Sequence, residues 1–449
     1  MPYHRFKKII FLLSLFNVCF YTNAQLKLSS PLKLCADNRT TKECFGWSCI
    51  LYKNYCLIGT PEKNMKIKGN YLQETGIVYI YERKAPLNWE LKQKISSPNV
   101  TSFDFFGGSI SMTDSFIVVG AAGVDDSLTK NPRVSNGAVF VYKKNKVKWY
   151  LHQTIKLAEI NYANRFGSKV LLNNNRLYVN AINKRKNIEG NNSTGGIFIY
   201  ELNSAGLWEL KKQLLPPEKN LLMFGSEFAV ENNLLLVNAE NMSKAFLFQL
   251  EDKDRSLNHE LIHSFSNPQK EDEGFGNELA LHKGQIIIAS YGSFEHNDNL
   301  PDDDSLVLRQ RQKLLKGAGC IYIYEGDTGK YALKQKLIAK DNKADLHFGN
   351  CIAVNDTLML VGAFGDKLDR SCANNRYAGA AYLFAYRNGQ WKQLKKITSP
   401  KRAIWDKFGF SVSIDNNYIM VGSRFDEEDV DELNPLDEAG SAYIYKIIK

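Results

Sequence analysis

Seven Phe-Gly dipeptides follow one another at a spacing of roughly sixty residues along the 449-residue chain, and this regularity restricts the fold more than any other feature. Repeats of that length indicate a chain built from one supersecondary unit. Between Phe408 and Ile414 large apolar residues alternate with Gly and Ser, so the large ones, Phe410 included, are expected on one face of a strand. The seven units begin at Phe45-Gly46, Phe106-Gly107, Phe166-Gly167, Phe224-Gly225, Phe275-Gly276, Phe348-Gly349 and Phe408-Gly409.

Each unit continues with three more apolar segments separated by turn residues. A tight turn such as Asn416-Asn417 joins the first two, because Asn, Asp and Gly accept the positive φ values of two-residue hairpins. A loop of variable length leads to the third segment, and a fourth starts at a Trp in several units. Units of this kind, without helical periodicity between them, predict an all-β fold: a seven-bladed β-propeller of four-stranded antiparallel blades.

The two ends of the repeat array fit together. The seventh unit stops at Lys449, after its third strand, and has no fourth strand of its own. The sequence Leu26-Lys27-Leu28-Ser29-Ser30-Pro31 repeats the pattern that ends the fourth strand at Pro98. We therefore expect residues 25–31 to complete the last blade and close the ring, which removes an exposed sheet edge. Residues 25–449 would then form a single propeller domain.

The first 24 residues are typical of a secretory signal peptide. A basic stretch (residues 4–8) precedes an apolar core (residues 9–20), and small residues predict cleavage after Ala24. The apolar core is too short for a membrane span, and no second one follows. A lipoprotein signal at Cys19 is disfavoured, because the residues before it are not small. The chain is therefore predicted to be secreted, to the extracellular space or the periplasm, without a transmembrane segment.

The repeated unit resembles the FG-GAP repeat, which builds the seven-bladed head of integrin α chains and many bacterial surface proteins. The second unit carries the resemblance most clearly, from Phe106-Gly107 through Gly120-Ala121-Ala122 to residues 137–142. The resemblance covers nearly all of the chain after the leader and implies an extracellular recognition module. Integrin repeats hold calcium in a DxDxDG loop between the first two strands. A tight hairpin takes that place here, so the repeats are more similar to the short, metal-free bacterial variety.

The loops between second and third strands are expected on one face of the ring, a usual location for binding residues. They span approximately residues 123–136, 183–195, 292–317, 365–378 and 426–439. Their charged residues suggest a ligand-docking face or, more weakly, a calcium site; the alternative is a set of solvated loops. The weak calcium candidates are Asp302, Asp303, Asp304, Asp426, Asp429 and Asp431. The candidates for the ligand-binding face are Asp125, Asp126, Arg185, Arg309, Asp366, Asp369 and Glu428.

The chain has 8 cysteines, and 7 remain without Cys19, an odd number that leaves at least one unpaired. Cys35 and Cys44 bracket a polar loop and are the predicted disulfide. The repeated tryptophans are expected to pack at the rim, with a sugar-binding platform as the alternative. Trp47 and Trp405 are also expected to be packing residues.

Composition and motifs exclude some function classes. The net charge of +10 is spread over segments of mixed sign and does not form the basic stripe that nucleic acid requires. No GxSxG, HExxH or phosphate-binding glycine loop is present, so neither enzyme activity nor a cofactor is expected. We expect a secreted or cell-surface binding or adhesion module that recognises a protein or glycan through the long-loop face. One alternative is a polysaccharide hydrolase or lyase, which carboxylates in a deep central pocket would favour; another is a structural subunit of an envelope complex.

Overall fold

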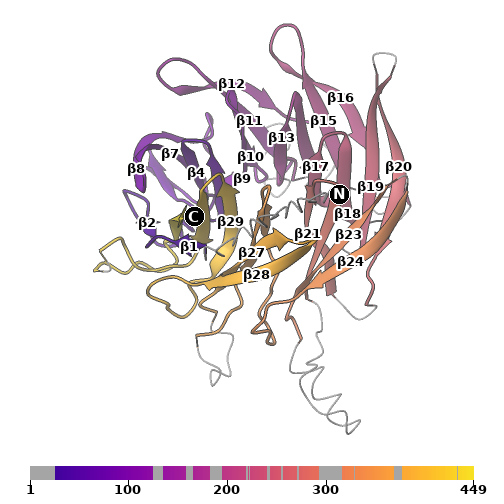
Figure 1. Cartoon of the computed structure of the whole chain (residues 1–449). Helices are drawn as coiled ribbons and strands as arrows, with labels where there is room; N and C mark the ends of the chain where they lie inside the picture. Colours follow the sequence, from indigo (N-terminus) through magenta and orange to yellow (C-terminus); the bar gives the residue numbers. More distant parts are fainter. Residues whose placement is uncertain are drawn as a thin grey trace, which may run out of the picture.

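The computed structural model describes residues 26–124, 135–157, 165–182, 195–218, 221, 223–239, 243–253, 256–269, 273–292, 316–327, 329–368, 377–431 and 433–448. In these residues every regular element is a β-strand, and no helix long and apolar enough to cross a membrane occurs. The strands form seven antiparallel blades that stand around a common axis (Figure 1). The predicted fold class is confirmed.

The first three blades follow one another along the chain. Blade 1 comprises β3 (Ser48–Tyr52), β4 (Tyr55–Thr60), β7 (Ile77–Ala85) and β8 (Asn88–Ile95), and the small hairpin β5 (Met65–Ile67) and β6 (Asn70–Leu72) lies between β4 and β7. Blade 2 comprises β9 (Phe106–Met112), β10 (Phe116–Ala121), β11 (Ala138–Lys144) and β12 (Trp149–Ile155). Blade 3 comprises β13 (Val170–Asn173), β14 (Arg176–Ala181), β15 (Gly196–Leu202) and β16 (Trp208–Leu214).

The next three blades have the same order. Blade 4 comprises β17 (Phe224–Glu231), β18 (Leu234–Ala239), β19 (Lys244–Lys253) and β20 (Ser256–Ser266). Blade 5 comprises β21 (Glu273–His282), β22 (Gln285–Gly292), β23 (Cys320–Asp327) and β24 (Lys330–Leu337). Blade 6 comprises β25 (Ile352–Val354), β26 (Leu358–Ala363), β27 (Ala380–Arg387) and β28 (Gln390–Ile397).

Blade 7 joins the two ends of the chain. It takes β29 (Phe408–Asp415), β30 (Tyr418–Ser423) and β31 (Ser441–Ile448) from the C-terminal side. Two short strands, β1 (Lys27–Leu28) and β2 (Leu32–Leu34), pair one after the other along β31, and together they occupy the fourth position. The predicted closure is confirmed, but the closing segment reaches Leu34, beyond the expected residues 25–31. Pro31 lies at the bulge of this fourth strand, level with the unpaired Lys92 of blade 1. The predicted equivalence of Pro31 with Pro98 was therefore wrong, because Leu34 and not Leu28 takes the place of Ile95.

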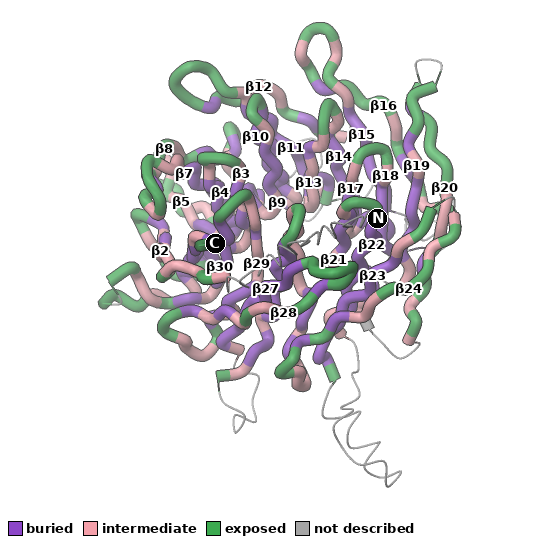
Figure 2. The backbone as a smooth tube through the Cα atoms, viewed as in Figure 1, coloured by how far each residue is buried: buried purple, intermediate pink, exposed green. Residues whose placement is uncertain are grey.

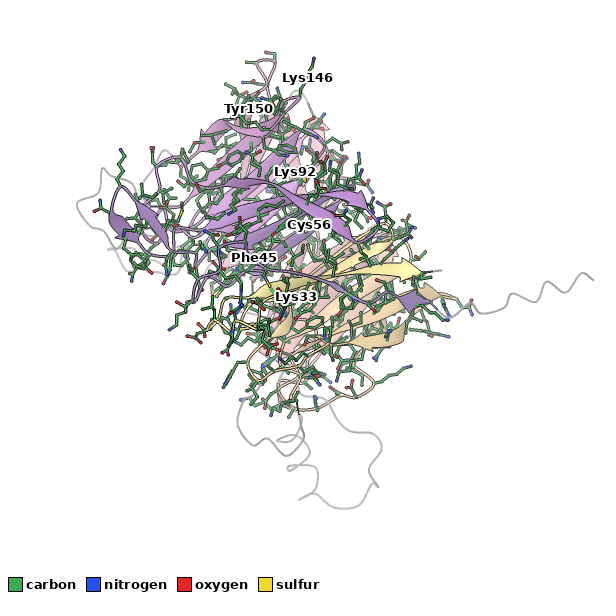
Figure 3. The ribbon with its side chains drawn as sticks, turned by 90° about the vertical axis from the view of Figure 1, so that its left-hand side faces the viewer. Lys33, Phe45, Cys56, Lys92, Lys146 and Tyr150 are labelled. Atoms are coloured by element: carbon green, nitrogen blue, oxygen red, sulfur yellow. The ribbon has the colours of Figure 1, made fainter. Side chains whose placement is uncertain are left out.

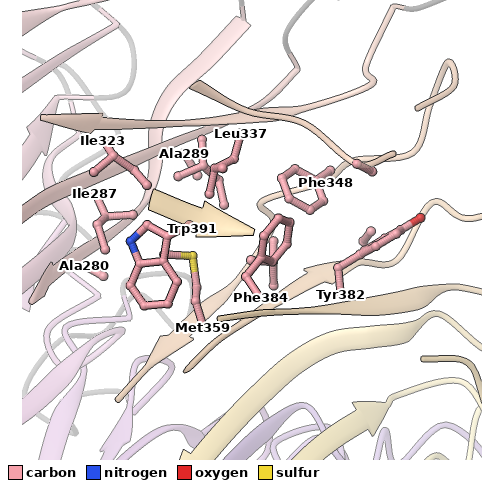
Figure 4. Packing of buried hydrophobic residues seen from close by; sticks show 14 of the residues in the cluster. Ala280, Ile287, Ala289, Ile323, Leu337, Phe348, Met359, Tyr382, Phe384 and Trp391 are labelled. Atoms are coloured by element: carbon pink, nitrogen blue, oxygen red, sulfur yellow. The ribbon is translucent and has the colours of Figure 1, made fainter. Parts of the chain in front are cut away.

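The hydrophobic core is divided into seven clusters, and each lies between two neighbouring blades. Between blades 5 and 6, for example, Met359, Phe384 and Trp391 pack against Ile287 and Ile323 (Figure 4). Burial is therefore continuous around the ring, whereas the turns at the blade ends are exposed (Figure 2). No blade buries its apolar faces alone, so neighbouring blades stabilise one another.

The Phe-Gly dipeptide makes a bulge at the start of the first strand in blades 2, 4, 5 and 7, and it lies just before the first strand in blades 1, 3 and 6. All seven phenylalanines are buried, and the glycine that follows has a φ of +81° to +93°, a region that favours glycine. In blade 7 Phe408 pairs with Ser423, but the next pair is Ser411 with Gly422, so two residues are inserted. The expectation that Phe410 shares a strand face with Phe408 was therefore wrong. The bulge turns Phe410 towards the site described below.

The repeated tryptophans are packing residues, as predicted. Trp89, Trp149, Trp208 and Trp391 are buried. A glutamine of the preceding blade binds both the amide and the carbonyl of the Trp in three cases: Gln93 with Trp149, Gln153 with Trp208 and Gln335 with Trp391. Each pair of hydrogen bonds ties one outer strand to the next, and the tryptophan ring fills the space between the blades.

Candidate binding face

The loops between second and third strands and the connections to the next blade reach the same end of the propeller, because the strands are antiparallel. We call this end the loop face, and the end with the short turns the hairpin face. On the loop face the amide of Phe donates to a carbonyl of the preceding blade, at 2.9–3.2 Å. These pairs are Phe45 with Ala439, Phe106 with Thr75, Phe166 with Asn136, Phe348 with Ala318 and Phe408 with Ala378. They give the loop face a hydrogen-bonded frame.

The residue before the Phe of each of the seven Phe-Gly units has a positive φ. Only blade 5 has a glycine there, Gly274; the others are Cys44, Phe105, Arg165, Met223, His347 and Lys407, with φ between +46° and +56°. A left-handed conformation costs a residue with a side chain roughly 1–2 kcal/mol, so the surrounding bulge must hold it. The position thus presents a chemically different side chain from each blade at the same place on the loop face.

Two cations of blade 7, Arg424 and Lys407, lie among aromatic rings on this face. The guanidinium carbon of Arg424 is 4.6 Å from the ring centre of Trp47, 4.1 Å from that of Phe410 and 4.3 Å from that of Phe425. The ammonium of Lys407 is 4.5 Å from the centre of the same Phe425 ring. These distances fit cation–π contacts, which stabilise a cation that is partly removed from water.

The rings continue onto blade 6. His347 stacks on Phe364 with centroids 4.9 Å apart and an interplanar angle of 19°, and Phe364 lies 6.1 Å from Phe410. The edge of Trp405 meets Tyr377 at 6.3 Å. We call Trp47, His347, Phe364, Tyr377, Trp405, Lys407, Phe410, Arg424 and Phe425 the cation–aromatic cluster.

Trp405 is the exposed member of the cluster. It is 47% solvent-accessible, so the expectation that it is a packing residue was wrong. Leu368, in the loop after the second strand of blade 6, is also exposed, at 43%. Large apolar side chains of this kind beside cations are the composition that protein interfaces favour.

Sequence reasoning missed the cluster because its members are scattered over three blades. A signal was nevertheless available. When the units are aligned on Phe-Gly, His347 and Lys407 occupy the column just before Phe. Phe364 and Arg424 occupy a second column, two residues after the second-strand glycines Gly362 and Gly422. Comparison of these two columns between units would have placed large polar and aromatic groups together on blades 6 and 7.

Asp366, predicted on the ligand-binding face, is instead completely buried. Its carboxylate forms ion pairs with Lys343, with Lys396 at 2.9 Å and with Arg402 at 2.7 Å. Three cations gather around one anion because an unpaired buried carboxylate would be costly. Asp366 therefore joins the connection before blade 6, through Lys343, to the connection after it, through Arg402, and is not available to a ligand.

Asp426 occupies the equivalent place in blade 7 and is also buried. It accepts hydrogen bonds from the hydroxyls of Ser441 and Tyr443, at 2.5 and 2.6 Å, and from the amide of Glu428 at 3.0 Å. Lys33 of the closing strand (labelled in Figure 3) pairs with it at 3.0 Å. Four donors already satisfy this carboxylate, which argues against its role as a calcium ligand.

The other described candidates of this loop also have protein partners. Asp429 accepts hydrogen bonds from Asn434 at 2.7 Å and from the amides of Leu433 and Asp431, and these bonds lower its pKa to about 2. Glu428 pairs with Lys401 at 2.6 Å. Within the described ranges, no three His, Cys, Asp or Glu side chains form a group that could hold a metal ion.

The remaining candidates lie outside the described residues. They are Asp125, Asp126, Arg185, Asp302, Asp303, Asp304, Arg309 and Asp369. Their assignment to a ligand-binding face or a calcium site stays a prediction.

The predicted Cys35–Cys44 disulfide is not formed, and this expectation was wrong. Both residues are free thiols with different neighbours. The thiol of Cys44 donates to Glu62 at 3.2 Å, whereas Cys35 lies 3.8 Å from the carbonyl of Glu428 in the seventh-blade loop. Burial raises the pKa of Cys35 to about 12, so it stays a protonated thiol. The segment between the two cysteines spans the junction of blades 7 and 1, which separates their side chains.

A second charged group lies on the first strands, which surround the axis of the ring. Lys169 of blade 3 pairs with Glu227 of blade 4, and Lys169 also acts electrostatically on Glu278 of blade 5. Burial raises the pKa of Glu278 to about 7, and burial lowers the pKa of Lys169. The carboxylates of Glu227 and Glu278 thus share the ammonium of Lys169 near the axis, so charges from adjacent blades neutralise one another.

Comparison with known proteins identifies the repeats. A family model described as "FG-GAP repeat" matches residues 89–142, 331–384 and 391–445. Each match runs from the fourth strand of one blade to the third strand of the next. No curated protein matches the chain.

Proposed function

Since this chain is a seven-bladed propeller of FG-GAP repeats, we propose that it is a secreted protein-binding module that engages its partner at a cell surface through the loop face. FG-GAP propellers are typically protein-binding, non-enzymatic scaffolds. The predicted leader, with its expected cleavage site after Ala24, supports the secreted location.

The cation–aromatic cluster is the observation that carries this proposal. Trp and Arg dominate the energetic centres of protein interfaces, and here Arg424, Trp47 and the exposed Trp405 lie on one face. The hydrogen-bonded frame of the loop face holds these side chains on rigid blades, so little conformational freedom is lost when a partner binds.

Site-specific photo-cross-linking tests the proposal. A benzophenone amino acid is placed at Trp405 on the loop face or, as a matched control, at Val147, which is 89% exposed in a turn of the hairpin face. The mature protein is irradiated in an extract of the producing cells' envelope. We expect a discrete protein adduct from position 405 and none from position 147. Equal labelling from both positions, or a carbohydrate adduct only, would reject a protein-binding loop face.

The secreted location has its own measurement. Mass spectrometry of the exported protein should find Gln25 as the N-terminal residue. A chain that stays inside the producing cell with its leader intact would reject this part of the proposal and leave the cross-linking result untouched.

A further inference from the structure

We infer that Arg424 and Lys407 form a recognition site for a carboxylate side chain of an acidic peptide segment in the partner protein. The inference rests on the proposed function and deepens it, because it names the chemistry that the loop face would recognise.

The first observation is that neither cation has an anionic partner. Among the described residues, neither Arg424 nor Lys407 has an ion pair within 4.0 Å, and no hydrogen bond is recorded for either side chain. The Nε of Arg424 is buried and has no hydrogen-bond partner. Buried polar groups normally have partners, so a half-buried guanidinium without a hydrogen bond on any of its nitrogens requires an explanation.

Three other arginines have partners on their terminal nitrogens, although the buried Nε atoms of Arg39 and Arg402 also lack a hydrogen bond. Arg176 binds Glu201 at 2.7 Å and Asp252 at 2.5 Å, and Arg402 binds Asp366. Arg39 donates to two backbone carbonyls. In contrast, Arg424 is half-buried against three aromatic rings, and none of its nitrogens has an ion pair or a hydrogen bond among the described residues.

The second observation is that the two cations lie close enough to oppose each other. Burial lowers the pKa of Lys407, and the neighbouring Arg424 lowers it further. Glu62 and Glu438 act on Arg424 electrostatically, but neither forms an ion pair with it, and Glu62 accepts the thiol of Cys44 instead. Cation–π contacts offset part of the cost of holding two like charges together, and an external anion would offset more.

The geometry favours a carboxylate. A guanidinium offers planar, parallel N–H groups that match the two oxygens of a carboxylate. Because the Nε of Arg424 is itself buried, an incoming carboxylate would meet the two terminal nitrogens, which have no hydrogen-bond partner among the described residues. Lys407 supplies a second positive charge without demanding a fixed orientation. Trp405, exposed two residues before Lys407, gives the rest of the ligand an apolar surface. A protein side chain of Asp or Glu satisfies all three contacts.

The experiment is a calorimetric titration of the mature protein with a blocked tetraglutamate peptide. Blocked tetraglutamine tests the need for charge, and tetragalacturonate tests whether a sugar carboxylate is the true ligand. The variants are R424Q and K407Q. The control is K146Q, which removes the same charge from an exposed turn of the hairpin face (Figure 3).

We expect tetraglutamate to bind the parent and K146Q equally and to bind R424Q or K407Q about tenfold more weakly, since charge-assisted hydrogen bonds are lost. R424K, which keeps the charge without the planar donors, should fall between R424Q and the parent. If R424Q does not fold, the affinity of K407Q for tetraglutamate tests the site instead. Equal binding by the parent and both variants, or binding of tetragalacturonate alone, would overturn the inference. If cross-linking at Trp405 succeeds while tetraglutamate does not bind, the protein-binding function stands and only the carboxylate site is wrong.

Discussion

Blades 1, 5, 6 and 7 differ from blades 2, 3 and 4 at one pair of residues that face each other across the third and fourth strands. In the first group the pair is a buried Tyr opposite a Lys, with the ammonium 5.4–5.6 Å from the ring centre: Tyr79 and Lys94, Tyr322 and Lys336, Tyr382 and Lys396, Tyr443 and Lys33. In the second group it is a Phe opposite an uncharged residue: Phe140 and Thr154, Phe198 and Gln213, Phe246 and Ser264.

The comparison teaches that one backbone register supports two kinds of interior. In blades 6 and 7 the Tyr hydroxyl donates to a carboxylate, Asp341 or Asp426, and the Lys pairs with the same carboxylate. The apolar blades need no such partners at this place. The polar blades are neighbours around the ring, and three of them, blades 6, 7 and 1, also supply the cation–aromatic cluster. Charge is therefore gathered in the part of the ring that carries the candidate site.

The largest effect should come from the buried carboxylate of the polar half. Asp366→Asn removes the anion that Lys343, Lys396 and Arg402 share, and we expect a loss of about 3–5 kcal/mol in unfolding free energy. At the same register in blade 2 stands Val124, and Val124→Ala should cost only about 1 kcal/mol. Thermal unfolding of both variants measures the difference; similar melting temperatures would remove the distinction between the two halves.

A pH-dependent effect should come next. Burial, and secondarily Asp426, raise the pKa of Asp406 to about 8, so the folded state keeps a proton that the unfolded chain releases near pH 4. Because the folded state binds more protons between these values, stability should fall as pH rises from about 4 to 8. Asp406→Asn should flatten this slope and gain about 2–4 kcal/mol at pH 8.

Melting temperatures of the parent and this variant between pH 5 and 8 provide the check. The matched control is Asp104, at the same position of blade 2, which accepts hydrogen bonds from the amide and hydroxyl of Thr101 at 2.9 and 2.5 Å. Asp104→Asn should lower the melting temperature at pH 8, where Asp406→Asn raises it. Parallel curves for the parent and Asp406→Asn would show that this carboxyl is ionised in the folded protein.

The smallest effect concerns a single hydroxyl. Tyr443→Phe removes the hydrogen bond to Asp426 and leaves three donors in place, so we expect a loss of about 1–2 kcal/mol. The reverse change in the apolar half, Phe140→Tyr, buries a hydroxyl opposite Thr154 and should cost a similar amount. If Phe140→Tyr leaves the unfolding free energy unchanged, the two groups of blades differ in sequence, but both can bury a tyrosine hydroxyl at this place.

The features that recur within each repeat unit could be predicted from the sequence. Phe408 and Trp391 recur in equivalent places in other units, so strand order, blade number and closure followed from their spacing. The bulge at Gly409 was missed, because simple alternation does not reveal a positive φ. Asp366 was misjudged because Lys343 and Arg402, which bury it, belong to segments on either side of its own loop. Contacts between blades depend on the closed ring, and no single repeat contains them.

The closing strand has a consequence for how the chain matures. The hydroxyl of Ser29 accepts a hydrogen bond from the amide of Lys446, across 417 positions of sequence. The closing segment is synthesised early, but it can pair only after β31, which is one of the last strands to be synthesised. Contacts of such long range are formed slowly, and until then β31 presents a bare edge to other chains. The molecule is thus most prone to aggregate in the interval before its ends meet, and a chaperone that shields either end would act on that interval.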